Sequence, residues 1–330
     1  MRGAQDTAPW RLSVAPMMEW TDRHCRFFHR QMSRRVLLYT EMVTAPAIVR
    51  GRALHLLEFD PREHPVAVQL GGSDARELAE AARLCAQAGY SEVNLNVGCP
   101  SDRVQSGGIG AVLMKDAPRV AECVSAMIAA SSVEVTVKCR IGVDDQDPEE
   151  VLPAFLETVS GAGVSRFAIH ARKAWLNGLS PRENRDVPPL DHALVHRMKR
   201  SFSHLRLSIN GGIASLDEAE EHLERGMDGV MIGRAAYQRP ADLLLEADRR
   251  LLGAGAATGR TRAQVVEAML PYIEAHLAAG GQLHQVSRHM LGLFHGQPGA
   301  RTWRRILSEG AHQGGAGPAL LERALAAVAP

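Results

Sequence analysis

The sequence lacks the paired cysteines that would indicate a disulfide framework or a zinc site. Its five cysteines are odd in number and widely spaced, and none of them forms a C-x-x-C pair. Free thiols are typical of a reducing compartment, so we expect a cytoplasmic protein. The five are Cys25, Cys85, Cys99, Cys123 and Cys139.

Long apolar runs and a strong net charge are also missing. No run approaches the roughly 20 apolar residues that cross a bilayer, and the first residues, MRGAQDTAPWRL, lack the apolar core of a secretory signal. The 38 Lys and Arg residues nearly balance the 37 Asp and Glu residues, which leaves a net charge of +1. This excludes a histone-like polycation, but a local basic patch can still bind phosphates. No G-x-G-x-x-G follows a predicted strand, so we expect no Rossmann half-domain.

Short β-branched runs alternate with longer amphipathic patterns up to about residue 245. This alternation predicts parallel strands joined by helices, and eight repeats over this length favour a closed (β/α)8 TIM barrel over an open sheet. Helical patterns between the strands cover 75–88, 118–130, 149–161 and 216–224. The predicted strands are 12–15, 36–40, 66–70, 92–96, 135–138, 166–170, 206–210 and 229–232.

The pattern changes near residue 250. The stretch LGAGAATGRT at 252–261 is rich in small residues and predicts a linker. Helical periodicity without strand signals follows at 262–279, 285–294, 300–310 and 318–328. We therefore expect an α/β barrel domain over 1–250, a linker over 251–261 and a small all-helical domain over 262–330.

Polar residues follow the predicted strands at their ends, where barrel enzymes place their active sites. One polar loop is ordinary, but polar groups in register at nearly every exit indicate a site. After the last two strands, glycines and an arginine predict a phosphate site. The exits carry Pro16-Met17-Met18, Glu41, Gln69, Asn96, Lys138, His170, Asn210-Gly211-Gly212 and Gly233-Arg234.

Three exit residues can carry chemistry. Lys138 follows the run VEVTV and is either a Schiff-base former or a fixed positive charge for an anionic cofactor. His170 can be a base or a cofactor donor, and because no ligand lies at metal-binding spacing from it, we expect no metal. Cys99 lies between Gly98 and Pro100, and its thiol, protonated at neutral pH, can donate a proton.

Taken together, the motifs resemble the tRNA-dihydrouridine synthases, from about residue 12 to residue 309. The shared motifs are VAPMM (14–18), YTEM (39–42), QLGG (69–72), NLNVGCP (94–100), HARK (170–173), NGGI (210–213) and DGVMIGR (228–234). Four further stretches resemble the A-type bacterial subgroup: 103–107, 138–147, 180–190 and 291–305.

The resemblance implies an FMN-dependent enzyme that reduces uridine to dihydrouridine at positions 20 and 20a of the tRNA D-loop. Hydride would pass from reduced FMN N5 to uridine C6, Cys99 would protonate C5, and NADPH, or NADH, would reduce the flavin again. Asn96 would contact the uridine or the tRNA. The residues implied to bind FMN are Pro16, Met17, Met18, Gln69, Lys138, His170, Asn210, Gly211, Gly212, Gly233 and Arg234.

A tRNA-binding protein with so small a net charge needs a localised basic surface. Residues 282–305 contain no acidic residue, and Arg301, Arg304 and Arg305 fall on one helical face near Trp303. The loop after the sixth predicted strand adds further cations. The predicted tRNA contacts on these segments are Arg172, Lys173, Arg182, Arg185, Arg301 and Arg304. No feature implies a membrane contact or a protein partner, and we expect a monomer.

Two other functions stay open at this point. An FMN-dependent dehydrogenase of the dihydropyrimidine or dihydroorotate type, acting on a free pyrimidine, would use the same phosphate site and Lys138. It would not need a basic helical domain. A non-catalytic RNA-binding protein would tolerate the loss of Cys99 or Lys138.

Overall fold

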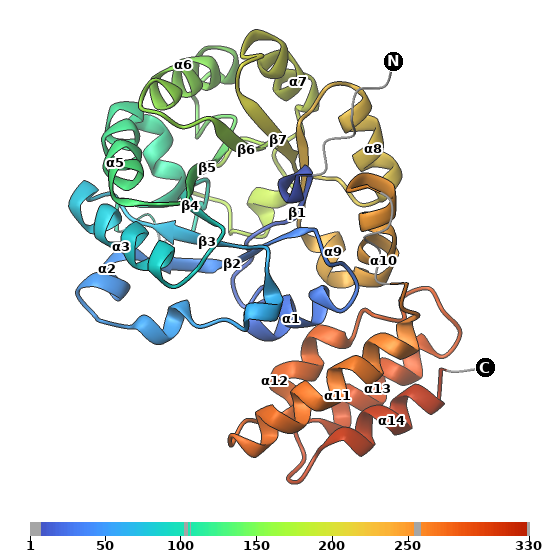
Figure 1. Ribbon diagram of the computed structural model, residues 1–330. Coiled ribbons are helices and arrows are strands. Elements are labelled where there is room, and N and C mark those ends of the chain that lie inside the picture. The colour runs from blue at the N-terminus through green and yellow to red at the C-terminus, as the bar shows by residue number, and fades with distance from the viewer. Residues whose placement is uncertain (1–7, 102–104, 106, 254–258, 329–330) are drawn as a thin grey trace.

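The computed structural model contains a closed barrel of parallel strands with helices around it, followed by a group of C-terminal helices (Figure 1). The strands pair in chain order, and the last closes the barrel against the first. The structure describes residues 8–101, 105, 107–253 and 259–328. The strands of this part are β1 (Leu12–Val14), β2 (Leu37–Thr44), β3 (Val66–Gly71), β4 (Glu92–Val97), β5 (Glu134–Arg140), β6 (Arg166–His170), β7 (Arg206–Asn210) and β8 (Gly229–Ile232). The predicted fold class is confirmed.

Most barrel helices begin at an aspartate whose side chain accepts a backbone N–H of the first turn, as at Asp22, Asp74 and Asp191. The helices around the barrel are α1 (Arg23–Arg30), α2 (Ala45–Val49), α3 (Ala75–Gln87), α5 (Ala117–Ala130), α6 (Pro148–Gly161), α7 (His192–Ser201), α8 (Leu216–Glu224), α9 (Arg234–Gln238) and α10 (Pro240–Leu251). The C-terminal helices are α11 (Arg262–Ala278), α12 (Leu283–Ser287), α13 (Ala300–Gly310) and α14 (Pro318–Ala326), with a 3-10 turn η6 (Arg288–Met290) after α12.

Two strands continue at least two residues further toward the active-site end than the sequence predicts, and β3 and β4 each continue by one residue. β2 ends at Thr44 rather than at residue 40, because after an irregularity between Tyr39 and Met42 it pairs again with β3. β5 ends at Arg140 rather than at residue 138, because β4 and β6 both pair with its polar end. Tertiary pairing therefore extends strands whose last residues are polar.

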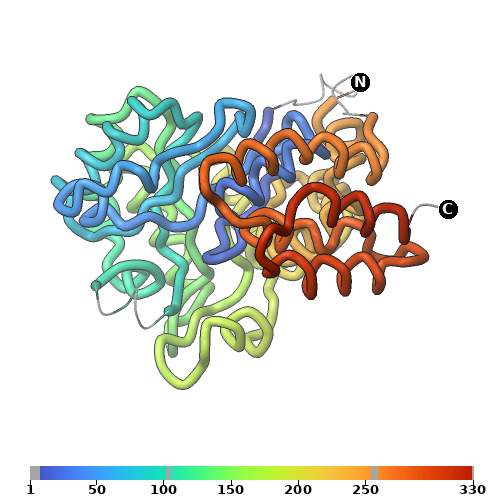
Figure 2. The backbone as a smooth tube through the Cα atoms, turned by 90° about the horizontal axis from the view of Figure 1, so that it is seen from below, coloured from blue at the N-terminus to red at the C-terminus, as the bar shows by residue number. Residues whose placement is uncertain are grey.

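The C-terminal helices pack on one side of the barrel, next to α1 (Figures 1 and 2). Asp22, which caps α1, accepts Arg288 Nη2 at 2.5 Å and lies 3.0 Å from His289 Nε2. Burial alone would raise the pKa of Asp22, but the hydrogen bond and charge of His289 hold it well below its usual range. This contact joins residues 266 positions apart and, with the stacked rings of Phe27 and Tyr272, links the helical region to α1.

The helical region agrees with prediction except in its second helix. The pattern at 285–294 is a short α12 followed by η6, and the other three helices lie where the sequence places them. Residues 254–258, the middle of the predicted linker, lie outside the described residues, as do 103, 104 and 106 of one subgroup motif. In the described part of the chain, no helix combines the length and apolar character needed to cross a membrane.

Candidate active site

The carboxyl ends of the strands surround a cavity of about 740 Å³, a volume typical of cofactor sites. Every residue predicted to bind the cofactor lines this cavity, together with Cys99, Asn96 and Arg185. The cofactor candidates at its wall are Pro16, Met17, Met18, Gln69, Lys138, His170, Asn210, Gly211, Gly212, Gly233 and Arg234. The exits of seven strands therefore contribute to one site, which is the arrangement that a barrel enzyme uses.

The turn that carries Cys99 is fixed by the side chain of Asn96. Asn96 Oδ1 accepts the backbone N–H of Gly98 at 3.0 Å and that of Cys99 at 2.9 Å. The Cys99 carbonyl accepts the N–H of Ala111 at 2.8 Å. Cys99 is half-buried, whereas the other four cysteines are buried. Cys99 is thus the thiol that a bound substrate can reach.

Lys138, two residues before the end of β5, and His170, at the end of β6, both line the cavity, and burial changes the ionisation of both. Burial and the charge of Arg140 lower the pKa of Lys138 to about 8. Burial, with Arg140 and Lys138 nearby, lowers the pKa of His170 well below its usual value, so its ring is neutral at pH 7. Lys138 Nζ donates to Asn210 Oδ1 at 3.2 Å. The site therefore contains a lysine that loses its proton more readily than usual and a neutral imidazole.

The turn after β7 requires its two glycines. Gly211 has a φ of +111° and Gly212 a φ of +78°, conformations that other residues rarely adopt. A Cβ on Gly211 would lie 2.6 Å from Cδ2 of His170, and one on Gly212 would lie 2.5 Å from Cδ1 of Leu190. His192 Nε2 lies 2.7 Å from the Gly211 carbonyl oxygen and holds the turn from outside.

Positive charge dominates the cavity wall. Among the described residues that line it, Glu19 is the one carboxylate, against five cationic side chains. The cations are Lys138, Arg140, Arg185, Arg234 and Arg239. Arg234, predicted to hold a phosphate, also pairs with exposed Asp186, its Nη2 lying 2.7 Å from Oδ1. A wall of this composition suits a phosphorylated ligand.

Comparison with known proteins decides between the functions left open above. Residues 13–329 match the model of the dihydrouridine synthase (Dus) family. The chain belongs to the dihydrouridine synthase family. It is 58% identical over 321 residues to a tRNA-dihydrouridine(20/20a) synthase of Salmonella typhi, covering 97% of this chain and 96% of that protein. The tRNA-dihydrouridine(20/20a) synthase of Vibrio vulnificus is 56% identical over 319 residues, covering 96% of this chain and 97% of that protein. The enzyme of the same name from Escherichia coli K12 is 58% identical over 320 residues, covering 97% of this chain and 92% of that protein.

Among solved structures, an old yellow enzyme homologue from Zymomonas mobilis is similar in fold. The superposition has a TM-score of 0.52 at 12% identity and covers 76% of this chain and 95% of that one. It supports the barrel. Family membership confirms the resemblance seen in the motifs and does not favour a dehydrogenase of free pyrimidines.

The remaining candidate residues of this family member lie away from the cavity wall. Arg172 donates to the carbonyl of Pro188, and Lys173 Nζ lies 5.5 Å from the centre of the Trp175 ring. Arg182 is exposed on the same loop, which projects from the barrel in Figure 2 (yellow-green). Arg301 and Arg304 are exposed on α13. The structure therefore separates these five cations from the residues that surround Cys99.

The basic segment 282–305 offers fewer surface groups than its sequence suggests. Trp303 is fully buried, and its indole N–H donates to the Met290 carbonyl at 3.0 Å, so it belongs to the core of the helical region. Arg288 and His289 are engaged by Asp22. The face predicted for Arg301, Arg304 and Arg305 is exposed as expected.

Arg140 is a site residue that the sequence reasoning missed. It is 3% exposed, lines the cavity, and donates through Nε to the Gly98 carbonyl at 3.1 Å. Its Nη1 donates to the Asn184 carbonyl at 2.9 Å, so it ties the Cys99 turn to the loop after β6. Burial lowers the pKa of Arg140 to about 10. Its position two residues after Lys138, on the same face of β5, was the available signal.

Proposed function

We propose that this chain binds FMN in the barrel cavity and reduces uridine to dihydrouridine at positions 20 and 20a of the tRNA D-loop. One observation carries the proposal: a single cavity collects Cys99 and every predicted cofactor residue. The relatives are named tRNA-dihydrouridine(20/20a) synthases, which supports tRNA as the substrate and positions 20 and 20a as the sites of reduction. The cavity fits the cofactor, because its volume and its excess of cations suit a flavin with a phosphate tail.

We propose a role for each part of the wall. Gly211, Gly212, Gly233 and Arg234, with Asn210, would hold the phosphate. Pro16, Met17, Met18, Gln69, Lys138 and His170 would contact the isoalloxazine. When bound, FMN supplies the hydride that adds to uridine C6.

The protein's own part in the reaction is proton transfer and charge stabilisation. Hydride addition at C6 places negative charge on C5 and the C4 carbonyl, and a thiol on the other face can protonate C5. Cys99 is the accessible thiol at the cavity wall. Lys138 would stabilise negative charge on the cofactor, and the burial of its ammonium group strengthens that interaction. Asn96, beside Cys99, would contact the incoming base.

The remaining proposals concern the domains, the tRNA contacts and the source of electrons. We propose a catalytic barrel domain over 1–250 and a tRNA-binding helical domain over 262–330, joined by 251–261. Arg301 and Arg304, with Arg172, Lys173, Arg182 and Arg185, would bind phosphates of the tRNA. NADPH, or NADH, would reduce the flavin. We further propose a cytoplasmic monomer, in keeping with five free cysteines.

The test is mass spectrometry of D-loop fragments. tRNA that lacks dihydrouridine is incubated with the protein, FMN and NADPH. A gain of two hydrogens at uridines 20 and 20a is the expected result. Flavin-loaded protein that NADPH bleaches, but that leaves the tRNA unchanged, would contradict the tRNA substrate while leaving the flavin site standing.

A further inference from the structure

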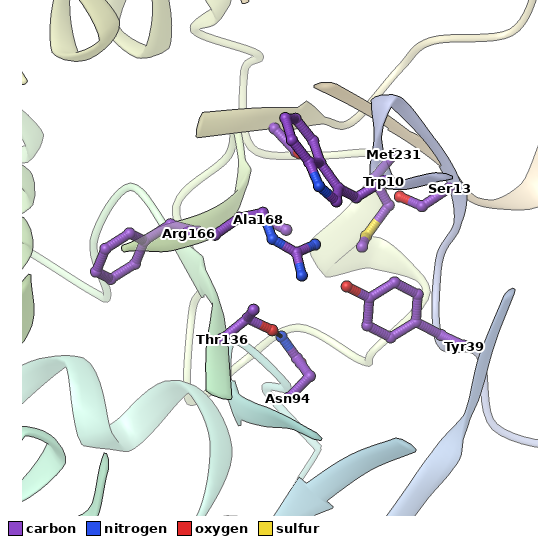
Figure 3. A pocket seen from close by; sticks show the side chains of 10 residues that line it. Trp10, Ser13, Tyr39, Asn94, Thr136, Arg166, Ala168 and Met231 are labelled. Carbon is purple, nitrogen blue, oxygen red and sulfur yellow. Dashed lines mark hydrogen bonds between the residues drawn. The ribbon is translucent and has the colours of Figure 1, made fainter. Parts of the chain in front are cut away.

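A line of buried polar side chains runs from the closed end of the barrel to the cavity wall. Its first member, Glu92, is 2% exposed, and Oε2 accepts Arg166 Nη2 at 2.6 Å. Glu92 Oε1 accepts the hydroxyls of Tyr39 and Thr136, each at 2.5 Å. Figure 3 shows Tyr39, Thr136 and Arg166 converging on this part of the interior. A cavity of only about 10 Å³ lies among them, so the region is closely packed.

From Thr136 the line continues through three side-chain amides to the cavity. Asn94 Nδ2 donates to Thr136 Oγ1 at 2.8 Å, and these two side chains face each other in Figure 3. Gln69 Nε2 donates to Asn94 Oδ1 at 2.8 Å. Asn96 Nδ2 donates to Gln69 Oε1 at 2.7 Å. Asn96 Oδ1 then accepts the backbone N–H groups of the Cys99 turn.

The direction of every bond in this line is fixed by its two ends. The carboxylate of Glu92 can only accept hydrogen bonds, so the Thr136 hydroxyl must donate its one proton to Glu92 and accept a hydrogen bond from Asn94. At the other end, the backbone N–H of Cys99 can only donate, so Asn96 must turn its oxygen toward it. Reversing any amide between them would place like groups against each other. Each amide therefore has one orientation.

We propose that Glu92 and Thr136 are positioning residues, which set the amide of Gln69 toward the cofactor and hold the backbone of the Cys99 turn through Asn94 and Asn96. The roles of Gln69 and Cys99 rest on the proposed function, whereas the hydrogen-bonded line does not. Neither Glu92 nor Thr136 lines the cavity, so both act through other residues.

Stability alone does not account for this line. Barrel interiors are usually filled by branched apolar residues, and replacing buried polar groups with apolar ones of similar shape is often neutral for folding. What the polar line adds is a unique orientation of each group, because a fully satisfied buried network rigidifies its members. A fixed orientation affects the chemistry at Gln69 and Cys99, the two residues of the line with proposed roles in cofactor binding and proton transfer.

The test compares Thr136→Val with Tyr39→Phe. Each variant removes one hydroxyl that donates to the same Glu92 oxygen. Thr136→Val also removes the acceptor of Asn94 and so breaks the line, whereas Tyr39→Phe leaves the line intact. Thr136→Ser restores the hydroxyl. The first readout is the alkylation rate of Cys99 in flavin-free protein, followed by peptide mapping. The second is kcat against KM with tRNA, and unfolding midpoints report stability. Thr136→Ala is the second variant if the valine does not fold.

We expect Thr136→Val to speed Cys99 alkylation and to lower kcat, each by about five- to tenfold, the equivalent of one hydrogen bond. Thr136→Ser and Tyr39→Phe should stay within about twofold. Wild-type behaviour of a folded Thr136→Val, or equal effects of Thr136→Val and Tyr39→Phe, would overturn the inference. If the wild type reduces no uridine, the proposed function fails, and alkylation still reports on the line.

Discussion

The two ends of the barrel interior treat charge in opposite ways. At the closed end, Arg166 Nη2 lies 2.6 Å from Glu92 and 2.7 Å from Glu134. Burial alone would lower the pKa of Arg166, but the charge of Glu92 and its neighbours raises it overall. At the open end, burial and the charge of Arg140 lower the pKa of Lys138 to about 8, and among the described residues no carboxylate pairs with Lys138. The buried cation is paired with carboxylates where the barrel is sealed, whereas Lys138 is not where the barrel opens.

The difference separates residues that serve folding from those that serve binding. Removing one partner of a buried ion pair strongly destabilises the fold, so the Arg166 ion pairs at the closed end should respond to substitution by unfolding. A cationic cavity wall has an electrostatic cost in the free protein, and a bound anion offsets it. The open end should therefore respond by losing affinity or rate, with little change in stability.

The largest expected effect is at the open end. Cys99→Ala removes the proposed proton donor and should slow uridine reduction by about 10²- to 10⁴-fold, the usual value of general acid catalysis. The unfolding midpoint should barely change, because Cys99 is half-buried. The measurement is single-turnover reoxidation of reduced flavin by tRNA. Cys85→Ala, at a buried thiol on α3, is the control and should keep the rate. A fast Cys99→Ala enzyme would exclude the thiol as the acid.

Substitution of Arg166 at the closed end should instead lower the stability of the protein. Arg166→Met leaves the Glu92 carboxylate buried without its cation, which should lower the free energy of unfolding by about 3–5 kcal/mol. Urea denaturation measures this. Arg250, on the surface of α10, pairs with Asp217 and Glu220, and its Met variant should lose about 1 kcal/mol or less. Similar losses in both variants would remove the distinction between sealed and exposed charge.

Sequence alone predicted the open end better than the closed end. Residues at strand exits follow short apolar runs, so Lys138, His170 and Gly211 could be recognised in order along the chain. Glu92 and Thr136 lie inside strands, where one polar residue carries no sign of its partners. Their hydrogen bond joins residues 44 positions apart, and only the closed barrel brings them together.

The same limit explains what the sequence left undetermined in the helical region. The sequence places Trp303 near three arginines, but helical periodicity does not say which face is covered. Packing decided it, since α13 turns Trp303, Leu307 and Gly310 inward. The arginine face was predictable from spacing, and the contact between Arg288 and Asp22 was not, because it depends on where the helices dock on the barrel.

A smaller effect should appear in the pH dependence of cofactor binding. In the free protein Lys138 is charged below about pH 8 and neutral above it. The charged form attracts the anionic cofactor, so FMN affinity should fall as the pH rises through 8, by at most about tenfold per pH unit. Fluorescence titration of FMN at several pH values measures this. Lys138→Arg is the control, since a guanidinium stays charged and should flatten the profile.

The same shift has a consequence of the opposite sign for stability. The folded pKa of Lys138 lies below the usual lysine value of about 10.4. Between these two values the unfolded chain binds more protons than the folded one, so this group makes the flavin-free protein more stable as the pH rises. Affinity and stability should therefore change in opposite directions over this range, and a parallel fall of both would indicate general unfolding instead.

The smallest expected effect extends the comparison to the exposed cations of α13. If Arg304 binds a tRNA phosphate, Arg304→Ala should weaken tRNA binding severalfold at low salt and reduce the slope of log K against log salt by about 0.7–0.9. Filter binding at several salt concentrations measures the slope. Arg323→Ala is the matched control, an exposed arginine on α14 of the same helical region. Equal changes in both variants would mean that only the overall charge of the region matters, whereas a change confined to Arg304 would show that the tRNA follows the α13 face and reaches the barrel from that side.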